Sequence, residues 1–475
     1  MSVRVAVIGG GVAGLSAAWE LVRSGEDLSV TLFEGSDRVG GKMRLAEVGG
    51  AVIDVGAESV LARRPEAVEL FAELGLGARV THPSGVGAAI LSRGRRWPMP
   101  RGTVMGVPSD PESVRGLLTD DEVDRLAAER VGPPVAGDVA VGAFIAERLG
   151  PAVTDRLVEP LLAGVYAGHS RELSLEMSVP VLHRAAVEGR SVSDVARETA
   201  AAAQTAGGSP RPVFATLRGG LGALPTLLAA ELLTRGVDLR LGETVRALQA
   251  PPVGGVGRPT WTLVSGPTND ERAESFDAVV LATPAAPGAR LLAAVAPDAA
   301  RLLSGVDYAS VAIVSLVVAG RPDALEGSSG FLVPPTESLV IKASTFSSSK
   351  WTWLREAHPD LTFLRASVGR HREEASLQRP DDELVDLALG DVRGVLGVLP
   401  EVVGAHVQRW GGGLPQYAVG HRARVEAVRD GLPSSVVVAG AAYDGVGVPA
   451  CIGSGRAAAR TLVTRLRTTG QPLRG

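Results

Sequence analysis

The 475-residue chain is poor in several residue types on which whole classes of function depend. Its one cysteine, Cys451, excludes an intramolecular disulfide framework and metal sites built from several cysteines. The seven histidines show neither an HxH nor an HExxH spacing, so no metal site is predicted. Lysine occurs only as Lys42, Lys342 and Lys350, which limits any mechanism that depends on a lysine.

Long apolar runs and an excess of basic residues are also missing. The longest apolar stretch, residues 310–319, is far shorter than the roughly 20 residues that a membrane-spanning helix needs. Lys and Arg number 48 against 52 Asp and Glu, so the net charge of −4 argues against nucleic-acid binding. Residues 3–8 are typical of a first β-strand rather than a leader. We expect a cytoplasmic protein without a transmembrane segment, although peripheral contact with a membrane is allowed.

What remains has the composition of a globular protein. Hydrophobic residues make up 45% and charged residues 21%, which excludes a disordered or fibrous chain. At about 150 residues per domain, the length predicts two or three domains. Buried-strand patterns occur at both ends of the chain and again at residues 278–282, with helical and mixed segments between them. The domains are therefore expected to be interleaved in the sequence.

A glycine-rich turn follows the first predicted strand directly. Gly9, Gly11 and Gly14 fill a GxGxxG pattern between this strand and a predicted helix. The first glycine permits the tight turn, the second lets a pyrophosphate approach the backbone, and the third lets the helix pack on the sheet. Glu34 ends the next predicted strand, residues 29–34, where a carboxylate can accept hydrogen bonds from ribose. The whole unit predicts a dinucleotide site, a plain glycine turn being the alternative.

The segment after Glu34 favours a flavin over a nicotinamide cofactor. Residues 34–42 read E-x-x-x-R-x-G-G-K, which resembles the corresponding segment of flavoproteins of the amine oxidase superfamily. Residues 56–59, 243–245 and 443–449 are similar to further cofactor segments of that superfamily. The resemblance implies FAD as the cofactor. The residues that it implies for FAD contacts are Gly9, Gly10, Gly11, Val12, Ala13, Gly14, Glu34, Gly35, Lys42, Gly56, Ala57, Glu58, Ser59, Val245, Trp410, Val446, Gly447 and Val448.

The same resemblance implies an α/β fold with three parts. A Rossmann-like FAD-binding domain of the glutathione-reductase type would be interleaved with an α+β substrate-binding domain and a helical subdomain. The expected FAD-binding domain comprises residues 1–80, 213–300 and 430–475. The expected substrate-binding domain comprises residues 81–104 and 301–429, and the helical subdomain residues 105–206, which end at the Gly-Gly-Ser-Pro break of residues 207–210.

Two further segments resemble a narrower group, the protoporphyrinogen and coproporphyrinogen oxidases. Residues 164–168 read GVYAG and residues 415–417 read Pro-Gln-Tyr, while residues 214–221 and 347–351 are also similar. The resemblance implies a six-electron oxidation of a porphyrinogen in heme biosynthesis, with dioxygen consumed and hydrogen peroxide formed. Coproporphyrinogen III is favoured as substrate, and protoporphyrinogen IX is the alternative. Transient contact with a downstream ferrochelatase is also allowed.

The substrate contacts are less well marked in the sequence. His169 follows the GVYAG segment where the family often has Asp, and the basic residue expected beyond the predicted hairpin of residues 88–98 is absent. Arg101 is the nearest candidate for binding a propionate, because arginine suits carboxylates. Tyr166 and Lys350 complete the expected substrate contacts, with a packed core tyrosine and a surface lysine as their alternatives. No catalytic side chain is expected, because hydride would pass directly to flavin N5.

Two other functions stay open. A flavin amine oxidase would normally hold a lysine beside flavin N5, and none of the three lysines matches that position in the sequence. A non-catalytic relative that binds prenylated proteins, such as a guanine-nucleotide dissociation inhibitor, shares the fold. The intact terminal segment at residues 443–449 argues against the second alternative.

Overall fold

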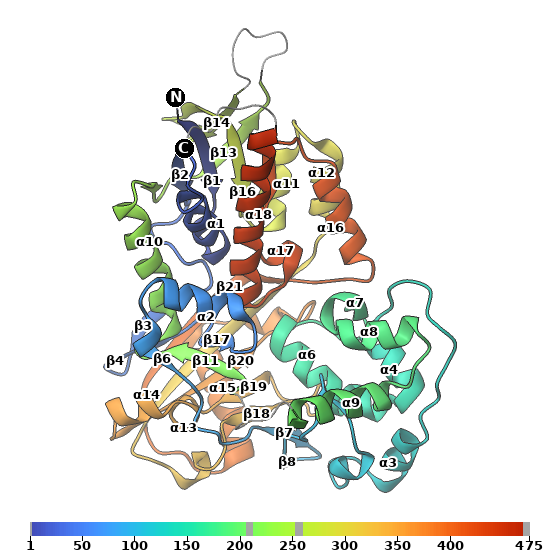
Figure 1. The fold of residues 1–475 in the computed structure, drawn as a ribbon. Coiled ribbons are helices and arrows are strands. Elements are labelled where there is room, and N and C mark those ends of the chain that lie inside the picture. Colours follow the sequence, from blue (N-terminus) through green and yellow to red (C-terminus); the bar gives the residue numbers. More distant parts are fainter. Residues whose placement is uncertain (1, 206–211, 252–259, 469–475) are drawn as a thin grey trace.

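The protein is described by a computed structural model that covers residues 2–205, 212–251 and 260–468. A parallel five-stranded sheet lies in the upper part of Figure 1, in the order β12-β2-β1-β16-β22. Its central strands are buried on both faces, as expected of a parallel sheet covered on each side. The predicted interleaved α/β fold is confirmed, since distant segments share this sheet. The strands are β1 (Val3–Ile8), β2 (Leu28–Phe33), β12 (Asp238–Arg240), β16 (Ala278–Leu281) and β22 (Val436–Val438).

Different layers cover the two faces of this sheet. One face packs against helices α1 (Val12–Val22), α2 (Pro65–Glu73), α10 (Leu224–Thr234) and α18 (Val448–Thr468). Against the other lie an antiparallel sheet and three helices: β13 (Val245–Gln249), β14 (Trp261–Ser265), β15 (Arg272–Phe276), α11 (Ala285–Leu292), α12 (Pro297–Ser304) and α16 (His421–Asp430). The sequence predicts the last helix over residues 452–466, but α18 begins four residues earlier, at the terminal glycine turn.

A second sheet of seven strands fills the lower left of Figure 1, in the order β21-β17-β20-β19-β18-β7-β8. Helix α15 (Asp381–Leu396) packs on one of its faces. The opposite face carries half-buried side chains, among them Arg365 and Ser367. The hairpin predicted over residues 88–98 is β7 and β8. The seven strands are β7 (Ala89–Ser92), β8 (Arg95–Pro98), β17 (Tyr308–Ala319), β18 (Gly330–Leu332), β19 (Ile341–Thr345), β20 (Leu361–Val368) and β21 (Val402–Pro415).

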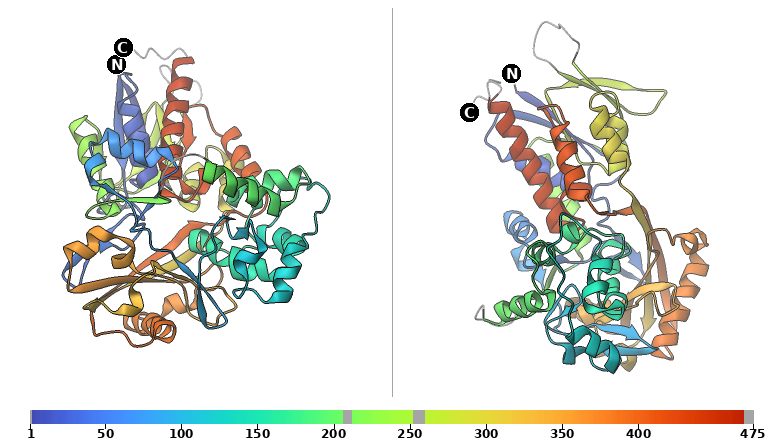
Figure 2. Two further views of the ribbon diagram at one scale, coloured as in Figure 1. Left: turned by 60° about the horizontal axis from the view of Figure 1, so that its bottom comes forward. Right: turned by 90° about the vertical axis from the view of Figure 1, so that its right-hand side faces the viewer.

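A group of helices forms the third part, in the lower right of Figure 1, and Figure 2 shows it beside the second sheet. The helices enclose one hydrophobic core that also takes in Ile90 of β7 and Tyr417. Thr119 begins the group with a capping box, in which Glu122 and Thr119 bond each other's backbone N–H groups. The helices are α3 (Asp120–Ala127), α4 (Val141–Leu149), α5 (Pro151–Val153), α6 (Glu159–Tyr166), α7 (Leu175–Ser178), α8 (Pro180–Val187) and α9 (Val192–Thr205).

Short elements connect these three parts. The hairpin of β3 and β4 packs against the seven-stranded sheet, and β11 pairs with both β5 and β6. The predicted break at residues 207–210 lies outside the described residues, and the predicted domain limits stay predictions. The connecting elements are β3 (Leu45–Val48), β4 (Ala51–Asp54), β5 (Val60–Leu61), β6 (Val80–Thr81), β9 (Thr103–Val104), β10 (Val107–Pro108), β11 (Phe214–Leu217), α13 (Ser347–Lys350), α14 (Thr352–Ala357) and α17 (Ala441–Asp444).

Helices α1 and α18 lie so close together that one glycine decides their packing. A Cβ atom on Gly455 of α18 would collide with the main-chain oxygen of Ala13 in α1. We expect Gly455→Ala to lower the free energy of unfolding by about 1–3 kcal/mol, as overpacked sites do. Gly394→Ala is the matched control, because that helical glycine of α15 is exposed and its Cβ would meet no atom within 4 Å. Chemical denaturation measures both, and equal stability of the two variants would contradict the packing argument.

Candidate active site

The glycine turn that opens α1 combines two tight contacts with one open position. The backbone of Gly9 has φ +112°, and a Cβ there would lie 2.6 Å from the main-chain oxygen of Ala282. A Cβ on Gly14 would collide with the oxygen of Gly9. A Cβ on Gly11, by contrast, would meet no atom within 4 Å. Gly9 and Gly14 are therefore needed for packing, while Gly11 borders open space at the N-terminus of α1, where a pyrophosphate fits.

Glu34 reaches this turn from the end of the neighbouring strand. Its Oε2 accepts a hydrogen bond of 2.7 Å from the N–H of Gly10, and its Oε1 accepts from the N–H and hydroxyl of Ser36. Strand β2 ends at Phe33 rather than at Glu34, but the N–H of Glu34 still donates to the oxygen of Arg240 in the adjacent β12. The half-buried carboxylate is thus held beside the turn, in a position suited to ribose hydroxyls.

The second glycine pair is joined to the first turn by the backbone. The N–H of Gly40 donates to the oxygen of Gly10 at 2.8 Å, and Gly40 forms an isolated parallel β-bridge with Gly11. Lys42 follows this pair, and desolvation by the protein around it lowers the pKa of its ammonium group. Burial raises the pKa of the Cys451 thiol to about 11, so it is protonated at neutral pH and acts as a buried small residue.

The terminal and adenine-side segments border the same region. Gly440 precedes the turn that carries residues 446–448. A Cβ on Gly440 would lie 3.7 Å from the Cβ of Ala13 at the start of α1. Ser454 holds this turn by accepting from the N–H of Gly440 at 2.9 Å. On the other side, the hydroxyl of Thr244, the residue before Val245, lies 2.9 Å from the Cβ position of Gly35. Segments from four parts of the chain therefore surround the N-terminus of α1.

Glu58 and Lys350, which the sequence assigns to cofactor and substrate, form one ion-pair cluster with Arg365. The Nζ of Lys350 lies 2.6 Å from Oε1 of Glu58, and Nη1 of Arg365 lies 2.9 Å from its Oε2. The two cations lower the pKa of Glu58 to about 2, although burial alone would raise it. The surface-lysine alternative does not hold for Lys350, because its side chain is only 15% exposed and is paired with Glu58, while its contact with a substrate stays a prediction.

The same cluster fixes the backbone of residues 56–59. Arg365 also donates from Nη2 to the oxygen of Gly56 at 2.6 Å, and the hydroxyl of Thr216 donates to the oxygen of Glu58 at 2.7 Å. The N–H of Ala57 donates to the oxygen of Lys42, which connects this segment with the second glycine pair. Arg365 and Thr216 are absent from the sequence prediction. The signal for Arg365 was the single charged residue in strand β20.

The GVYAG and Pro-Gln-Tyr segments contact each other directly. The side-chain amide of Gln416 donates to the oxygen of Tyr166 at 2.8 Å, and the rings of Tyr166 and Tyr417 lie edge to face at 5.6 Å. Tyr166 is only 8% exposed, which favours the packed-core alternative, whereas its neighbour Val165 is 43% exposed. Trp410 of β21 packs beside Ala167 at the end of the GVYAG segment.

Arg101 lies apart from these contacts. It is exposed in the turn between β8 and β9, and no hydrogen bond or ion pair within the described ranges 2–205, 212–251 and 260–468 joins it to Tyr166 or Lys350.

Within those ranges, no group of three or more His, Cys, Asp or Glu could hold a metal ion. Among the same residues there is no helix with the length and apolar character to cross a membrane.

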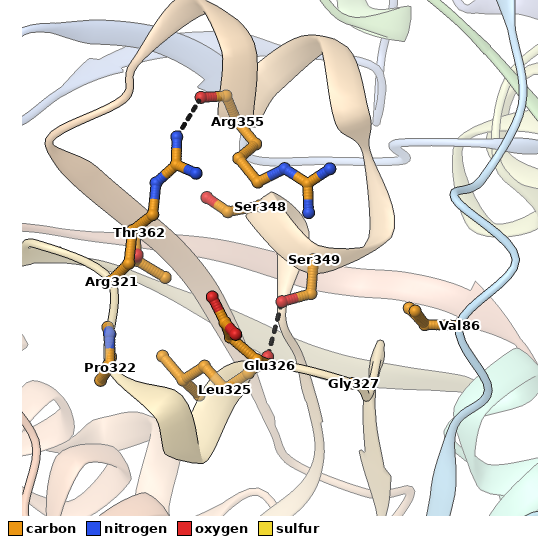
Figure 3. Close-up of a pocket in the computed structure, with 10 residues that line it drawn as sticks. All are labelled: Val86, Arg321, Pro322, Leu325, Glu326, Gly327, Ser348, Ser349, Arg355 and Thr362. Atoms are coloured by element: carbon orange, nitrogen blue, oxygen red, sulfur yellow. Dashed lines mark hydrogen bonds between the residues drawn. The ribbon is translucent and has the colours of Figure 1, made fainter.

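A separate cavity of about 140 Å³ lies behind α13 and contains none of the predicted site residues (Figure 3). Arg321 and Arg355 flank it, and Ser349 closes one side by donating to the oxygen of Leu325 at 2.6 Å. Arg321 is already held by the main-chain oxygens of Pro359 and Arg355. We assign this cavity no role in the site.

Gly11 gives a direct test of the dinucleotide position. We expect Gly11→Leu to fold normally, because its side chain would point into open space, and to lose the cofactor, because it would occupy the pyrophosphate path. Gly77→Leu is the control, since Gly77 is exposed and its Cβ also meets no atom within 4 Å. Flavin absorbance per protein and the melting temperature measure the two effects. Wild-type flavin content in Gly11→Leu would show that the placement is wrong.

The Glu58 cluster makes a prediction about stability and pH. Glu58→Gln leaves Lys350 and Arg365 as neighbouring, partly buried cations, so we expect a loss of about 3–5 kcal/mol in the free energy of unfolding. Lys350→Met should cost less, and the double variant should recover part of the loss. A carboxylate with a lowered pKa contributes stability above its ordinary pKa of 4.5 that disappears as the pH falls towards 2. Urea unfolding across this range should show a smaller acid loss for Glu58→Gln than for the wild type.

Comparison with known proteins agrees with this site. The chain matches the family model for flavin containing amine oxidoreductases over residues 12–463. It is 39% identical to coproporphyrinogen III oxidase of Mycobacterium leprae (strain TN), covering 95% of this chain and 96% of that protein. It is 31% identical to protoporphyrinogen oxidase of Bos taurus, covering 97% and 98%. A solved structure from Exiguobacterium sp. 255-15, described as a candidate protoporphyrinogen oxidase, superposes with a TM-score of 0.84 at 29% identity over 98% and 99% of the two chains.

These similarities cover 95–98% of the chain, and the segments that carry the resemblance in the sequence are likewise spread along nearly its whole length. They confirm the expected fold, with FAD as the cofactor of an oxidoreductase. The site that surrounds the N-terminus of α1 fits that cofactor, because Gly11 leaves room for a pyrophosphate and Glu34 offers a fixed carboxylate beside it. The chain belongs to the family of flavin-containing amine oxidoreductases.

Proposed function

We propose that the protein oxidises coproporphyrinogen III to coproporphyrin III, a six-electron reaction that consumes dioxygen and forms hydrogen peroxide in heme biosynthesis. The observation that carries the proposal is the 39% identity to a coproporphyrinogen III oxidase over nearly the whole of both chains. The direct contact of the GVYAG and Pro-Gln-Tyr segments supports it, because these are the most family-specific parts of the sequence.

In this proposal the FAD lies along the segments that surround α1. The N–H groups of the Gly9–Gly14 turn face the pyrophosphate, and Glu34 accepts from the ribose hydroxyls. Residues 56–59, Val245, Trp410 and residues 446–448 complete the contacts. When bound, the flavin supplies the acceptor for hydride from substrate carbon.

The chain itself contributes position and electrostatics. The N-terminal end of α18, a helix of 21 residues, places a positive dipole end beside the terminal turn, where it stabilises negative charge. The Glu58 cluster carries one carboxylate against two cations, so it adds a further positive charge while holding residues 56–59 in place. No strong general base is needed, since porphyrinogens are electron-rich and release hydride readily. The structure accordingly needs only to bind, orient and shield the substrate.

Protoporphyrinogen IX is the second candidate substrate. The observation that favours it is the 31% identity to the bovine protoporphyrinogen oxidase, again over nearly the full length of both chains. We propose dioxygen as the second substrate, a cytoplasmic location, and transient contact with a downstream ferrochelatase or a membrane surface. An amine oxidase activity is disfavoured because the chain is similar to porphyrinogen oxidases over nearly its full length.

The assay that tests the proposal compares the two porphyrinogens directly. Purified protein is mixed with coproporphyrinogen III or protoporphyrinogen IX, first without oxygen to follow flavin bleaching and then in air to follow porphyrin fluorescence. We expect a higher kcat/KM for coproporphyrinogen III, with peroxide formed alongside the porphyrin. A higher value for protoporphyrinogen IX would select the second candidate. Peroxide formed with amines while both porphyrinogens stay inert would overturn the proposal.

A further inference from the structure

Two cations lie inside the protein without a carboxylate partner. Lys342 of β19 is 5% exposed and Arg370, just after β20, is 7% exposed. The Nζ of Lys342 donates to the oxygen of Gly369 at 2.6 Å, and Nη2 of Arg370 donates to the oxygen of Val333 at 2.8 Å. Among residues 2–205, 212–251 and 260–468, no ion pair joins either cation to a carboxylate, and burial is the largest cause of the lowered pKa of both. Both therefore rest on neutral main-chain oxygens alone.

This arrangement is costly unless a charge of opposite sign joins it. Lysine and arginine are almost never buried without a paired anion, because removal of an ionised group from water is expensive. A lysine offers three donors and an arginine five, so one carbonyl each leaves most donors unused. Burial and the neighbouring Arg370 lower the pKa of Lys342 to about 7, which is the expected response of an amine that lacks an anion.

The pair lies next to the segment that is expected to border the substrate. The N–H of His371, the residue after Arg370, donates to the oxygen of Ala167 in the GVYAG segment at 2.7 Å. A Cβ on Gly164, the first residue of the GVYAG segment, would lie 3.8 Å from the side chain of Leu332 in β18, the strand that pairs with β19. The side-chain nitrogens of Arg370 that make no hydrogen bond are not fully buried, so they are accessible to a ligand. An anion can therefore approach the pair from that side.

We propose that Lys342 and Arg370 form a binding site for a carboxylate, and that this carboxylate is a propionate of the porphyrinogen. The assignment of the carboxylate to the substrate rests on the proposed function. Coproporphyrinogen carries four propionates and protoporphyrinogen two, so either porphyrinogen can offer a carboxylate to this pair of cations. Arginine binds a carboxylate with two parallel hydrogen bonds, and the lysine adds a third donor.

The acidic groups nearest to the pair do not take this place. Glu159 and Glu373 both raise the pKa of Arg370, but neither reaches ion-pair distance. Glu159 accepts from the N–H of Ser170 at 2.7 Å, and its other oxygen lies 3.6 Å from Nδ1 of His169. Glu373 lies 3.4 Å from Nε2 of the same histidine. His169 thus faces these carboxylates and leaves the two cations free.

The test measures binding and turnover in three variants. Lys342→Met and Arg370→Met remove one charge each, and Arg370→Lys keeps it. The control is Arg372→Met, because Arg372 is exposed and already paired with Glu172 at 2.8 Å. For the two charge-removing variants we expect KM for coproporphyrinogen III to rise about 10- to 150-fold, the range for loss of a charge-assisted hydrogen bond, with kcat little changed. Arg370→Lys should recover part of the affinity, and KM for protoporphyrinogen IX should rise in the same charge-removing variants, because that substrate also carries propionates.

A second readout separates this site from a structural role. Without ligand, Arg370→Met and Lys342→Met should melt at or above the wild-type temperature, because each removes an unpaired buried charge. Fluorescence titration with coproporphyrin III, the oxidised product, should show the same loss of affinity without any turnover. Lower melting temperatures together with unchanged porphyrin affinity would overturn the assignment.

Failure of the proposed function would look different. If the wild-type protein oxidises neither porphyrinogen and binds no coproporphyrin, the proposed function is wrong. If the wild type oxidises coproporphyrinogen III and the variants keep its KM, only the carboxylate site is wrong. Titration with acetate as a free carboxylate adds a third arm. Calorimetric binding of acetate that is lost in Lys342→Met and Arg370→Met, without any effect of these variants on porphyrin affinity, would likewise overturn the assignment to a substrate propionate.

Discussion

The close approach of several backbones to the N-terminus of α1 is the constraint on which the rest of the structure depends. Gly9 and Gly14 bring the turn against β16, and Gly455 brings α18 against α1. Since no side chain fits at these contacts, the first and last segments of the chain are fixed around one point. Gly11 is the exception, because it leaves its side-chain position empty for the cofactor.

An ion-pair cluster connects the segment of residues 56–59 with the seven-stranded sheet. Arg365 of the seven-stranded sheet and Lys350 of α13 both form ion pairs with Glu58 in residues 56–59. Such a buried cluster is weak evidence for net stability, since desolvation offsets much of the attraction. Its value lies in geometry, because it fixes residues 56–59 relative to the seven-stranded sheet. Lys342 and Arg370 show the opposite case, a charge left uncompensated until a ligand arrives.

The sequence was most informative where local geometry carries the signal. A glycine turn between strand and helix needs particular residues at fixed spacing, so Gly9, Gly11 and Gly14 could be predicted together with Glu34. Substrate contacts have no such local pattern, because they depend on side chains from strands far apart in the sequence. Arg101 was chosen as the nearest basic residue beyond the predicted hairpin, and the structure leaves it exposed, with no hydrogen bond or ion pair to Tyr166 among the described residues.

The sequence by itself determined the glycine turn and the interleaved order of the fold, because each follows from short-range patterns, and it indicated the family through the resemblance of several segments. Only the tertiary structure decided that Lys350 belongs to Glu58 and that Tyr166 is packed against Tyr417. It also brought Lys342 and Arg370 together, since a strand and the end of its neighbour meet there. The physical reason is that burial and charge pairing are set by residues close in space, which sequence spacing does not record.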